Sequence, residues 1–127
     1  MSILADAPVS AGLPAVDIER AKAFYEGTLG LPLVQDLEGA LMFACGNGTM
    51  FFVYPSEFAG TNKATAAGFQ VDDIQAVMEE LRGKGVTFEE YDMPGLKTVD
   101  GIATLGPSKS AWFKDTEGNI LALVQGG

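Results

Sequence analysis

The chain has 127 residues, enough for one domain that buries about two-thirds of the surface of its unfolded chain. Its hydrophobic content of 47% with 20% charged residues is a globular balance and excludes a disordered chain. The formal charge of −9, with eight scattered Lys and Arg, excludes a surface for nucleic acid or anionic membranes.

The expected compartment follows from three features of the sequence. The first ten residues have neither a basic stretch nor a long apolar core, so we expect no secretory signal. No stretch approaches the roughly 20 apolar residues of a membrane span. The lone Cys45 excludes an intramolecular disulfide and is typical of a reducing compartment. We therefore expect a cytoplasmic protein.

The first predicted unit runs from residue 8 to residue 54. It opens with a strand, after which Asp17 stands where a helix N-cap is expected. The helix carries one apolar stripe, made of Ile18, Ala21, Phe24 and Tyr25. Three strands follow, at residues 30–34, around Phe43 and at residues 50–54. The order is therefore β-α-β-β-β.

A surface connection over residues 55–64 leads to a second predicted unit, residues 65–127. Its helix is capped near Asp72 and Asp73 and has an apolar stripe of Ile74, Val77, Met78 and Leu81. Strands are expected at residues 85–88, around Phe113 and at residues 120–124. Residues 93–101 are expected to form a long loop, either a lid or a plain surface loop.

The two units are imperfect copies of one module. Asp17 aligns with Asp73, and Gly48 aligns with Gly118, so that helices and turns recur in the same order. The second copy differs by its longer internal loop. The chain is therefore expected to contain the β-α-β-β-β module twice.

Two segments resemble the vicinal oxygen chelate superfamily, which includes glyoxalase I, bleomycin-resistance proteins and extradiol dioxygenases. They are residues 23–31 (AFYEGTLGL) and residues 112–123 (WFKDTEGNILAL). The second departs from the family pattern, since Thr116 replaces the usual Pro and Ala122 the usual Glu. The resemblance implies one glyoxalase-like α+β domain over residues 1–127, in which two βαβββ modules form a curved, cup-like mixed sheet with helices outside.

The same resemblance locates the positions that carry metal ligands in metal-dependent relatives. They fall at Ser10, Phe52, Ala66 and Ala122. The chain has no histidine, Ala and Phe offer no donor atom, and a neutral hydroxyl is a poor ligand. We therefore predict no metal and no other cofactor. A displaced site made of carboxylates stays open as an alternative, with Glu89, Glu90 and Asp92 as its candidates.

Side-chain alternation suggests what the cup contains instead of a metal. If Phe52 faces the cup, Phe51 and Val53 pack toward the helix. The candidate ligand-binding residues are Met42, Met50, Phe52, Tyr54, Gln70 and Trp112. Two interpretations stay open: these side chains line a pocket, or they fill the cup, with the Phe52 ring as a plug.

The first hypothesis for function is metal-independent binding of an apolar or cationic small molecule, as in drug-resistance members of the family. A second is a glyoxalase- or dioxygenase-like enzyme, a lyase or isomerase, with Tyr54, Tyr91 or Glu90 as acid-base groups or with the displaced metal site. A third is a structural or regulatory dimerisation module. The resemblance implies a homodimer. Whether the modules pair within one chain or between two is left open.

Overall fold

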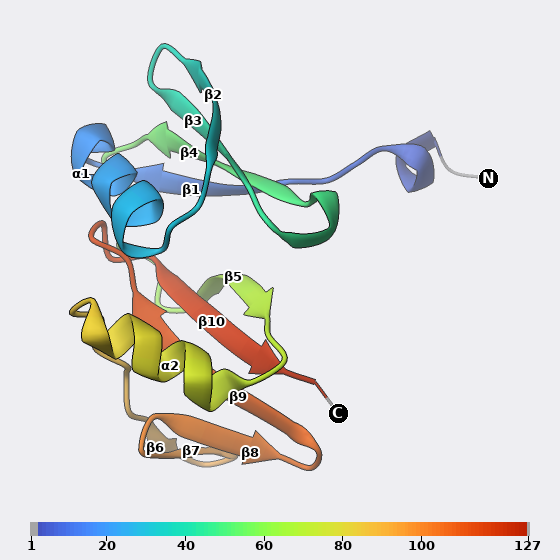
Figure 1. Cartoon of the computed structure of the whole chain (residues 1–127), viewed down its shortest axis with the longest axis vertical. Coiled ribbons are helices and arrows are strands. Elements are labelled where there is room, and N and C mark those ends of the chain that lie inside the picture. Colours follow the sequence, from blue (N-terminus) through green and yellow to red (C-terminus); the bar gives the residue numbers. More distant parts are fainter. Residues whose placement is uncertain (1–2, 127) are drawn as a thin grey trace.

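The computed structural model describes residues 3–126 and contains one sheet for each repeat (Figure 1). The first sheet has the strand order β1-β4-β3-β2. Its strands are β1 (Ala11–Ala15), β2 (Leu33–Leu37), β3 (Ala40–Ala44) and β4 (Met50–Pro55). β1 is parallel to β4, and the other neighbours are antiparallel.

The second sheet repeats this arrangement and extends it, with the order β5-β10-β9-β8-β7-β6. Its strands are β5 (Thr65–Gln70), β6 (Asp92–Met93), β7 (Leu96–Val99), β8 (Ile102–Leu105), β9 (Ser108–Lys114) and β10 (Ile120–Gln125). β5 is parallel to β10, as β1 is to β4. Gly12 pairs with Phe52 in the first sheet and Gly68 with Ala122 in the second, at corresponding places. The predicted α+β fold is confirmed.

Each module contributes one main helical segment. Helix α1 (Ile18–Lys22) begins after Asp17, whose carboxylate accepts the Arg20 N–H at 3.1 Å. It continues directly into a π-helical segment, η2 (Ala23–Thr28). Helix α2 (Ile74–Gly83) is capped in the same way by Asp73. Two short 3₁₀ turns complete the set, η1 (Ile3–Asp6) and η3 (Gly46–Gly48). None of the helices described is long and apolar enough to span a bilayer.

The two modules lie edge to edge and share one hydrophobic core on the helix side of their sheets. Phe51 and Val53 are buried in this core, as the alternation predicts. The rings of Phe51 and Phe69 meet across the module boundary with centroids 6.4 Å apart. β1 and β5 are the edge strands that approach each other there. The opposite faces of the sheets are therefore left without a helix.

Buried polar contacts also hold the modules together. The turn before β10 places Asp115 against the first module, where its carboxylate accepts the hydroxyl of Tyr25. The amide of Asn119 donates to the carbonyl of Pro14 at 2.8 Å. Glu117 accepts the backbone N–H of Asp17 at 2.8 Å. The turn before β10 thus attaches the second module to three parts of the first module: η2, the N-cap of α1 and β1.

The structure corrects two expectations for the second module. The strand expected at residues 85–88 is reduced to one bridge between Phe88 and Phe113. Residues 93–101, expected as a loop, are mostly β structure that adds β6, β7 and part of a hairpin to the sheet. The reason is turn chemistry: Asp100 and Gly101 both have positive φ, as the type I′ turn of a two-residue hairpin requires, and Gly95 has positive φ in the turn between β6 and β7.

Candidate functional site

The candidate residues of the first module gather on the face of its sheet that no helix covers. Met42 is the cross-strand partner of Phe52, and the Phe52 and Tyr54 rings lie 5.9 Å apart. Met50 is 44% and Tyr54 38% exposed. The Tyr54 hydroxyl has no hydrogen-bond partner among the residues that the structure describes. The face is therefore apolar and open, with one unused hydroxyl.

Phe52 lies directly over β1. A Cβ atom built on Gly12 would come within 2.7 Å of the Phe52 Cζ atom, so the ring occupies the space that a side chain at residue 12 would need. Phe52 stands at the metal-ligand position that the family resemblance assigns to β4. The ring thus covers the floor of the sheet where a donor atom would be required.

The second module covers its corresponding position with an aromatic ring from a different strand. The Trp112 indole N–H donates to the Thr65 hydroxyl at 3.1 Å, and this contact reaches from β9 across β10 to β5. Ala122 is the β10 partner of Trp112 and is 4% exposed. The small Ala122 side chain leaves room for the indole to cross. The Tyr91 ring packs edge-on against the indole with centroids 5.5 Å apart.

The remaining candidate positions lie apart from these aromatic groups. Gln70 is exposed and lines a hollow between η3 and β5, together with Cys45, Asn47 and Thr49. Ser10 and Ala66 are exposed. The structure thus brings Met42, Met50, Phe52 and Tyr54 together on one sheet and places Trp112 on the other.

Two residues that contact Trp112 on the second sheet, Thr65 and Tyr91, are not among the ligand-binding residues predicted from the sequence. A register shift between Ile120 and Leu121 precedes the regular pairing of β5 with β10 and brings Thr65 opposite Ile120. No sequence signal marks this irregularity. Tyr91 is recognisable in the sequence as an aromatic residue within an acidic run. Its contact with Trp112, however, depends on the hairpin that follows it.

The residues present do not fit a divalent metal. The four family positions supply one exposed hydroxyl and three side chains without a donor. Among residues 3–126, no group of three or more His, Cys, Asp or Glu side chains is placed to hold an ion. In the alternative acidic run, Glu89 pairs with Lys114 at 3.8 Å, and Glu90 accepts from Thr98 and from the Gly101 N–H. Glu90 therefore serves the β7–β8 hairpin, and Glu89 is engaged with a lysine of β9.

The remaining titratable candidates are shifted away from reactivity at neutral pH. Burial raises the pKa of the Cys45 thiol, which disfavours the nucleophilic thiolate. Burial and the nearby Glu89 carboxylate raise the pKa of Tyr91. The Tyr91 ring packs edge-on against the Trp112 indole. Both shifts favour the protonated, unreactive forms of these two side chains.

Comparison with protein families gives one match over nearly the whole chain. Residues 8–123 match the model described as Glyoxalase/Bleomycin resistance protein/Dioxygenase superfamily. Among curated proteins, none matches the chain.

Solved structures share the fold at low sequence identity. TnmS3, an antibiotic binding protein from a Streptomyces species, is 24% identical with a TM-score of 0.68, over 100% of this chain and 99% of that one. Lactoylglutathione lyase from Agrobacterium tumefaciens is 20% identical with a TM-score of 0.71, over 95% and 94%. FosX from Listeria monocytogenes, a fosfomycin resistance protein complexed with Mn(II) and sulfate, is 14% identical with a TM-score of 0.71, over 96% and 91%. Because these identities are below 25%, the likeness to these structures shows a shared fold alone.

Proposed function

We propose that this chain, which belongs to the Glyoxalase/Bleomycin resistance protein/Dioxygenase superfamily, binds a small apolar or cationic molecule without a metal ion. One observation carries the proposal: aromatic rings cover both sheets where metal-dependent relatives need donor atoms. Phe52 lies over Gly12, and the Trp112 indole crosses β10 at Ala122. A face built in this way offers flat apolar contact area.

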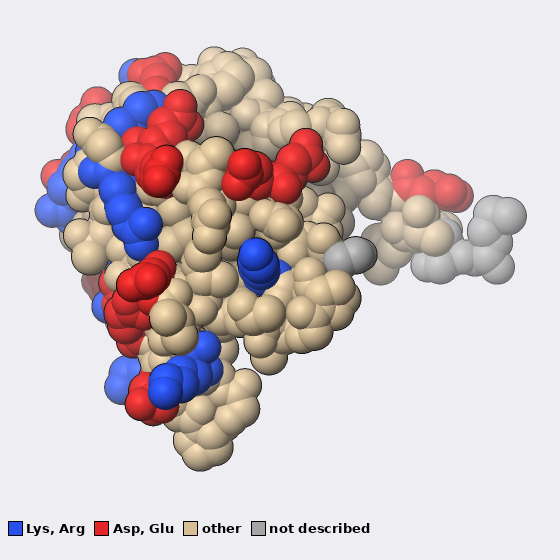
Figure 2. Space-filling model, turned by 60° about the horizontal axis from the view of Figure 1, so that its bottom comes forward, with Lys and Arg blue, Asp and Glu red and all other residues tan. Residues whose placement is uncertain are grey.

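The charge of the protein supports the cationic part of the proposal. The chain has a formal charge of −9, which raises the local concentration of cations. Figure 2 shows one face of the molecule, on which basic side chains lie among acidic ones and form no continuous basic stripe. Aromatic faces also attract a desolvated cation through their quadrupoles. The structural relative TnmS3 is itself an antibiotic binding protein, which agrees with a role in capture.

Completion of the binding cup is proposed to require a homodimer. Within one chain the modules pack edge to edge on the helix side, so the Phe52 face and the Trp112 face are not brought together by the shared core. A second copy would supply the opposite wall to each face, and two-fold pairing would build two equal cups. We further expect the protein to act in the cytoplasm, because its lone Cys45 is typical of a reducing compartment.

The test uses the fluorescence of Trp112, the single tryptophan of the chain. A planar aromatic cation and its neutral analogue are titrated into the protein, and the compounds are then recovered for mass spectrometry. We expect saturable quenching, tighter for the cation, with the compounds recovered unchanged. Absence of saturable quenching across a panel of planar compounds would refute the binding role, and conversion of a compound would replace it with an enzymatic one.

A further inference from the structure

The second sheet is longer than the first, with six strands against four, and β7 and β6 form its outer end (Figure 1). The segment of residues 88–91 precedes these strands and connects them to β9. At its start, Phe88 forms a bridge with Phe113 of β9. At its end, the Tyr91 carbonyl accepts the Thr98 N–H of β7 at 2.9 Å. The 88–91 segment thus links the outer hairpin to the strand that carries Trp112.

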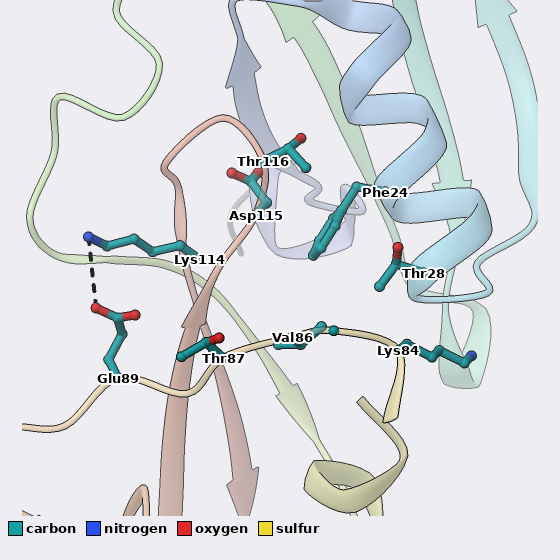
Figure 3. Close-up of a pocket in the computed structure, with 10 residues that line it drawn as sticks. Phe24, Thr28, Lys84, Val86, Thr87, Glu89, Lys114, Asp115 and Thr116 are labelled. Carbon is teal, nitrogen blue, oxygen red and sulfur yellow. Dashed lines mark ion pairs between the residues drawn. The ribbon is translucent and has the colours of Figure 1, made fainter. Parts of the chain in front are cut away.

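Glu89 attaches the 88–91 segment to β9 in two ways. Its backbone N–H donates to the Trp112 carbonyl at 2.8 Å. Its carboxylate points toward Lys114 and forms an ion pair with it at 3.8 Å (Figure 3). Because both side chains of this ion pair are solvent-accessible, the backbone hydrogen bond is the stronger of the two restraints. The segment is therefore held at the backbone of the residue whose indole lies on the aromatic face.

The Thr98 hydroxyl fastens the other end of the segment to β7. Thr98 is 8% exposed, and its Oγ1 atom accepts the Tyr91 N–H at 2.8 Å. The same atom lies 2.5 Å from Glu90 Oε1 and 3.3 Å from the Tyr91 carbonyl oxygen, so its single proton is donated to the carboxylate. Glu90 Oε1 also accepts the Gly101 N–H at 3.1 Å. One hydroxyl and one carboxylate oxygen thus join Tyr91 to β7 and to the turn before β8.

The restraints on Tyr91 reach the aromatic face of the second sheet through its ring. This ring packs against the Trp112 indole with centroids 5.5 Å apart and an angle of 82° between the ring planes. On its other side, the indole N–H donates to the Thr65 hydroxyl of β5 at 3.1 Å. Trp112 is only half-buried, and its side chain can turn about two torsions. Both contacts are therefore needed to keep the indole in one orientation.

We propose that Thr98 and Glu90 are positioning residues for the ligand-binding face of the second module. They hold the Tyr91 ring against the Trp112 indole, so that the indole keeps the orientation in which it meets a ligand. Their effect on the indole passes through Tyr91. The inference rests on the function proposed above, because it takes the indole as a ligand contact. The orientation itself is a property of the ligand-free chain and is measured there.

The first measurement is two-dimensional NMR of the isotope-labelled, ligand-free full chain. Thr98→Val has a similar shape but removes the hydroxyl, whereas Thr98→Ser keeps it. We expect Thr98→Val to shift the Trp112 indole N–H signal and to speed its exchange with solvent about tenfold, and Thr98→Ser to stay close to the wild type. Glu90→Ala should behave like Thr98→Val. Glu90→Gln keeps an acceptor oxygen and should behave like Thr98→Ser.

A double-variant cycle tests whether the effect passes through Tyr91. Tyr91→Leu removes the ring and should itself move the indole signal, after which adding Thr98→Val should move it no further. Tyr25→Phe removes a buried hydrogen bond at the module joint and is the control for general destabilisation. It should leave the indole signal in place. Additive shifts in the cycle, or an indole shift in Tyr25→Phe equal to that in Thr98→Val, would overturn the proposal.

The second measurement is ligand binding, followed by quenching of Trp112 with 9-aminoacridine, a planar aromatic cation. Thr98→Val should weaken binding about tenfold, and Thr98→Ser should bind like the wild type. Equal affinities of the wild type and Thr98→Val would overturn the positioning role alone. Absence of saturable quenching in the wild type would overturn the proposed function, and the role of Thr98 in binding with it.

Discussion

The Phe52 ring lies over the Cα atom of Gly12, so a side chain that needs a glycine beneath it occupies the β4 position to which the family resemblance assigns a metal ligand. A Cβ atom at residue 12 would come within 2.7 Å of Cζ and 3.0 Å of a second ring carbon. Gly12 does not have a positive φ. Its role is therefore spatial: it provides room for the ring.

Replacing either partner should alter the aromatic face. Gly12→Ala should displace the Phe52 ring, and Phe52→Ala should remove it, so both variants should weaken binding of planar ligands, the second about tenfold. Phe52→Ala should also lower the free energy of unfolding by about 1–2 kcal/mol, less than a fully buried Phe because the ring is half-buried. Trp112 quenching and denaturant unfolding measure the two effects.

The matched control is Phe58→Ala, since Phe58 is 68% exposed in the connecting loop. It should change neither binding nor stability by a measurable amount. If Phe52→Ala instead gains affinity for planar ligands, the Phe52 ring is a plug, and the cup is filled in the native protein.

The ion pair between Arg20 and Glu117 should make the module joint sensitive to acid. The Glu117 side chain has no exposed surface and lies 2.7 Å from the Arg20 Nε atom. Burial alone would raise its pKa, but hydrogen bonds from Arg20, the Asp17 N–H and Thr116 outweigh burial and lower the pKa from 4.5 to about 2. The charged form is therefore favoured in the folded state.

Because the folded-state pKa is depressed, this stabilisation is complete above the unfolded value of 4.5 and is lost as the pH falls from there to about 2. Its upper limit is about 3 kcal/mol, and solvent at the half-exposed Arg20 reduces it. Glu117→Gln should lower the unfolding free energy at pH 7 and flatten its pH dependence in that window. Lys114→Met, which removes the exposed pair with Glu89, should cost less than about 1 kcal/mol. If Glu117→Gln and Lys114→Met lower the unfolding free energy equally, the buried pair is no more stabilising than the exposed one, and the prediction is wrong.

The sequence predicted the architecture well because short local patterns mark its helices and turns. The N-caps Asp17 and Asp73 and the two apolar helix stripes are each visible within a few residues. The alignment of Asp17 with Asp73 then identified the two units as copies of one module. The hairpin at residues 92–105 was missed because Gly95 and Gly101 are equally compatible with an irregular loop, and only the pairing with β9 distinguishes the two.

The candidate site was predictable only in part. The side-chain alternation in β4 follows from strand geometry, and it correctly separated Phe51 and Val53 from the opposite face. The contact between Trp112 and Thr65 depends on a register shift that has no sequence signature. The small apolar hollow lined by Leu29, Leu31 and Val77 depends on how the two modules meet, which no local pattern encodes.

Removal of the Tyr25 hydroxyl should weaken the joint between the modules. Tyr25 is fully buried and donates to Asp115, a carboxylate that is 6% exposed. Tyr25→Phe keeps the ring packing but leaves the charged acceptor with one partner fewer, which should cost about 1–3 kcal/mol. Tyr54→Phe, whose hydroxyl has no partner in the described residues, is the control and should leave the melting temperature unchanged. A similar melting temperature for both variants would show that the buried hydrogen bond is dispensable.

Chelation should leave the protein unaffected, since the positions that the resemblance assigns to metal ligands supply no imidazole and no carboxylate. Protein purified without a histidine tag should contain no stoichiometric Zn, Ni, Mn or Fe by elemental analysis. Dialysis against EDTA should change neither the melting temperature nor ligand quenching of Trp112, because structural metal sites contribute directly to folding and their loss would be visible. Addition of Mn(II), the ion in the FosX structure, should likewise leave the melting temperature unchanged. A melting temperature that rises with Mn(II) and falls with EDTA would require a carboxylate site that residues 3–126 do not display as a cluster.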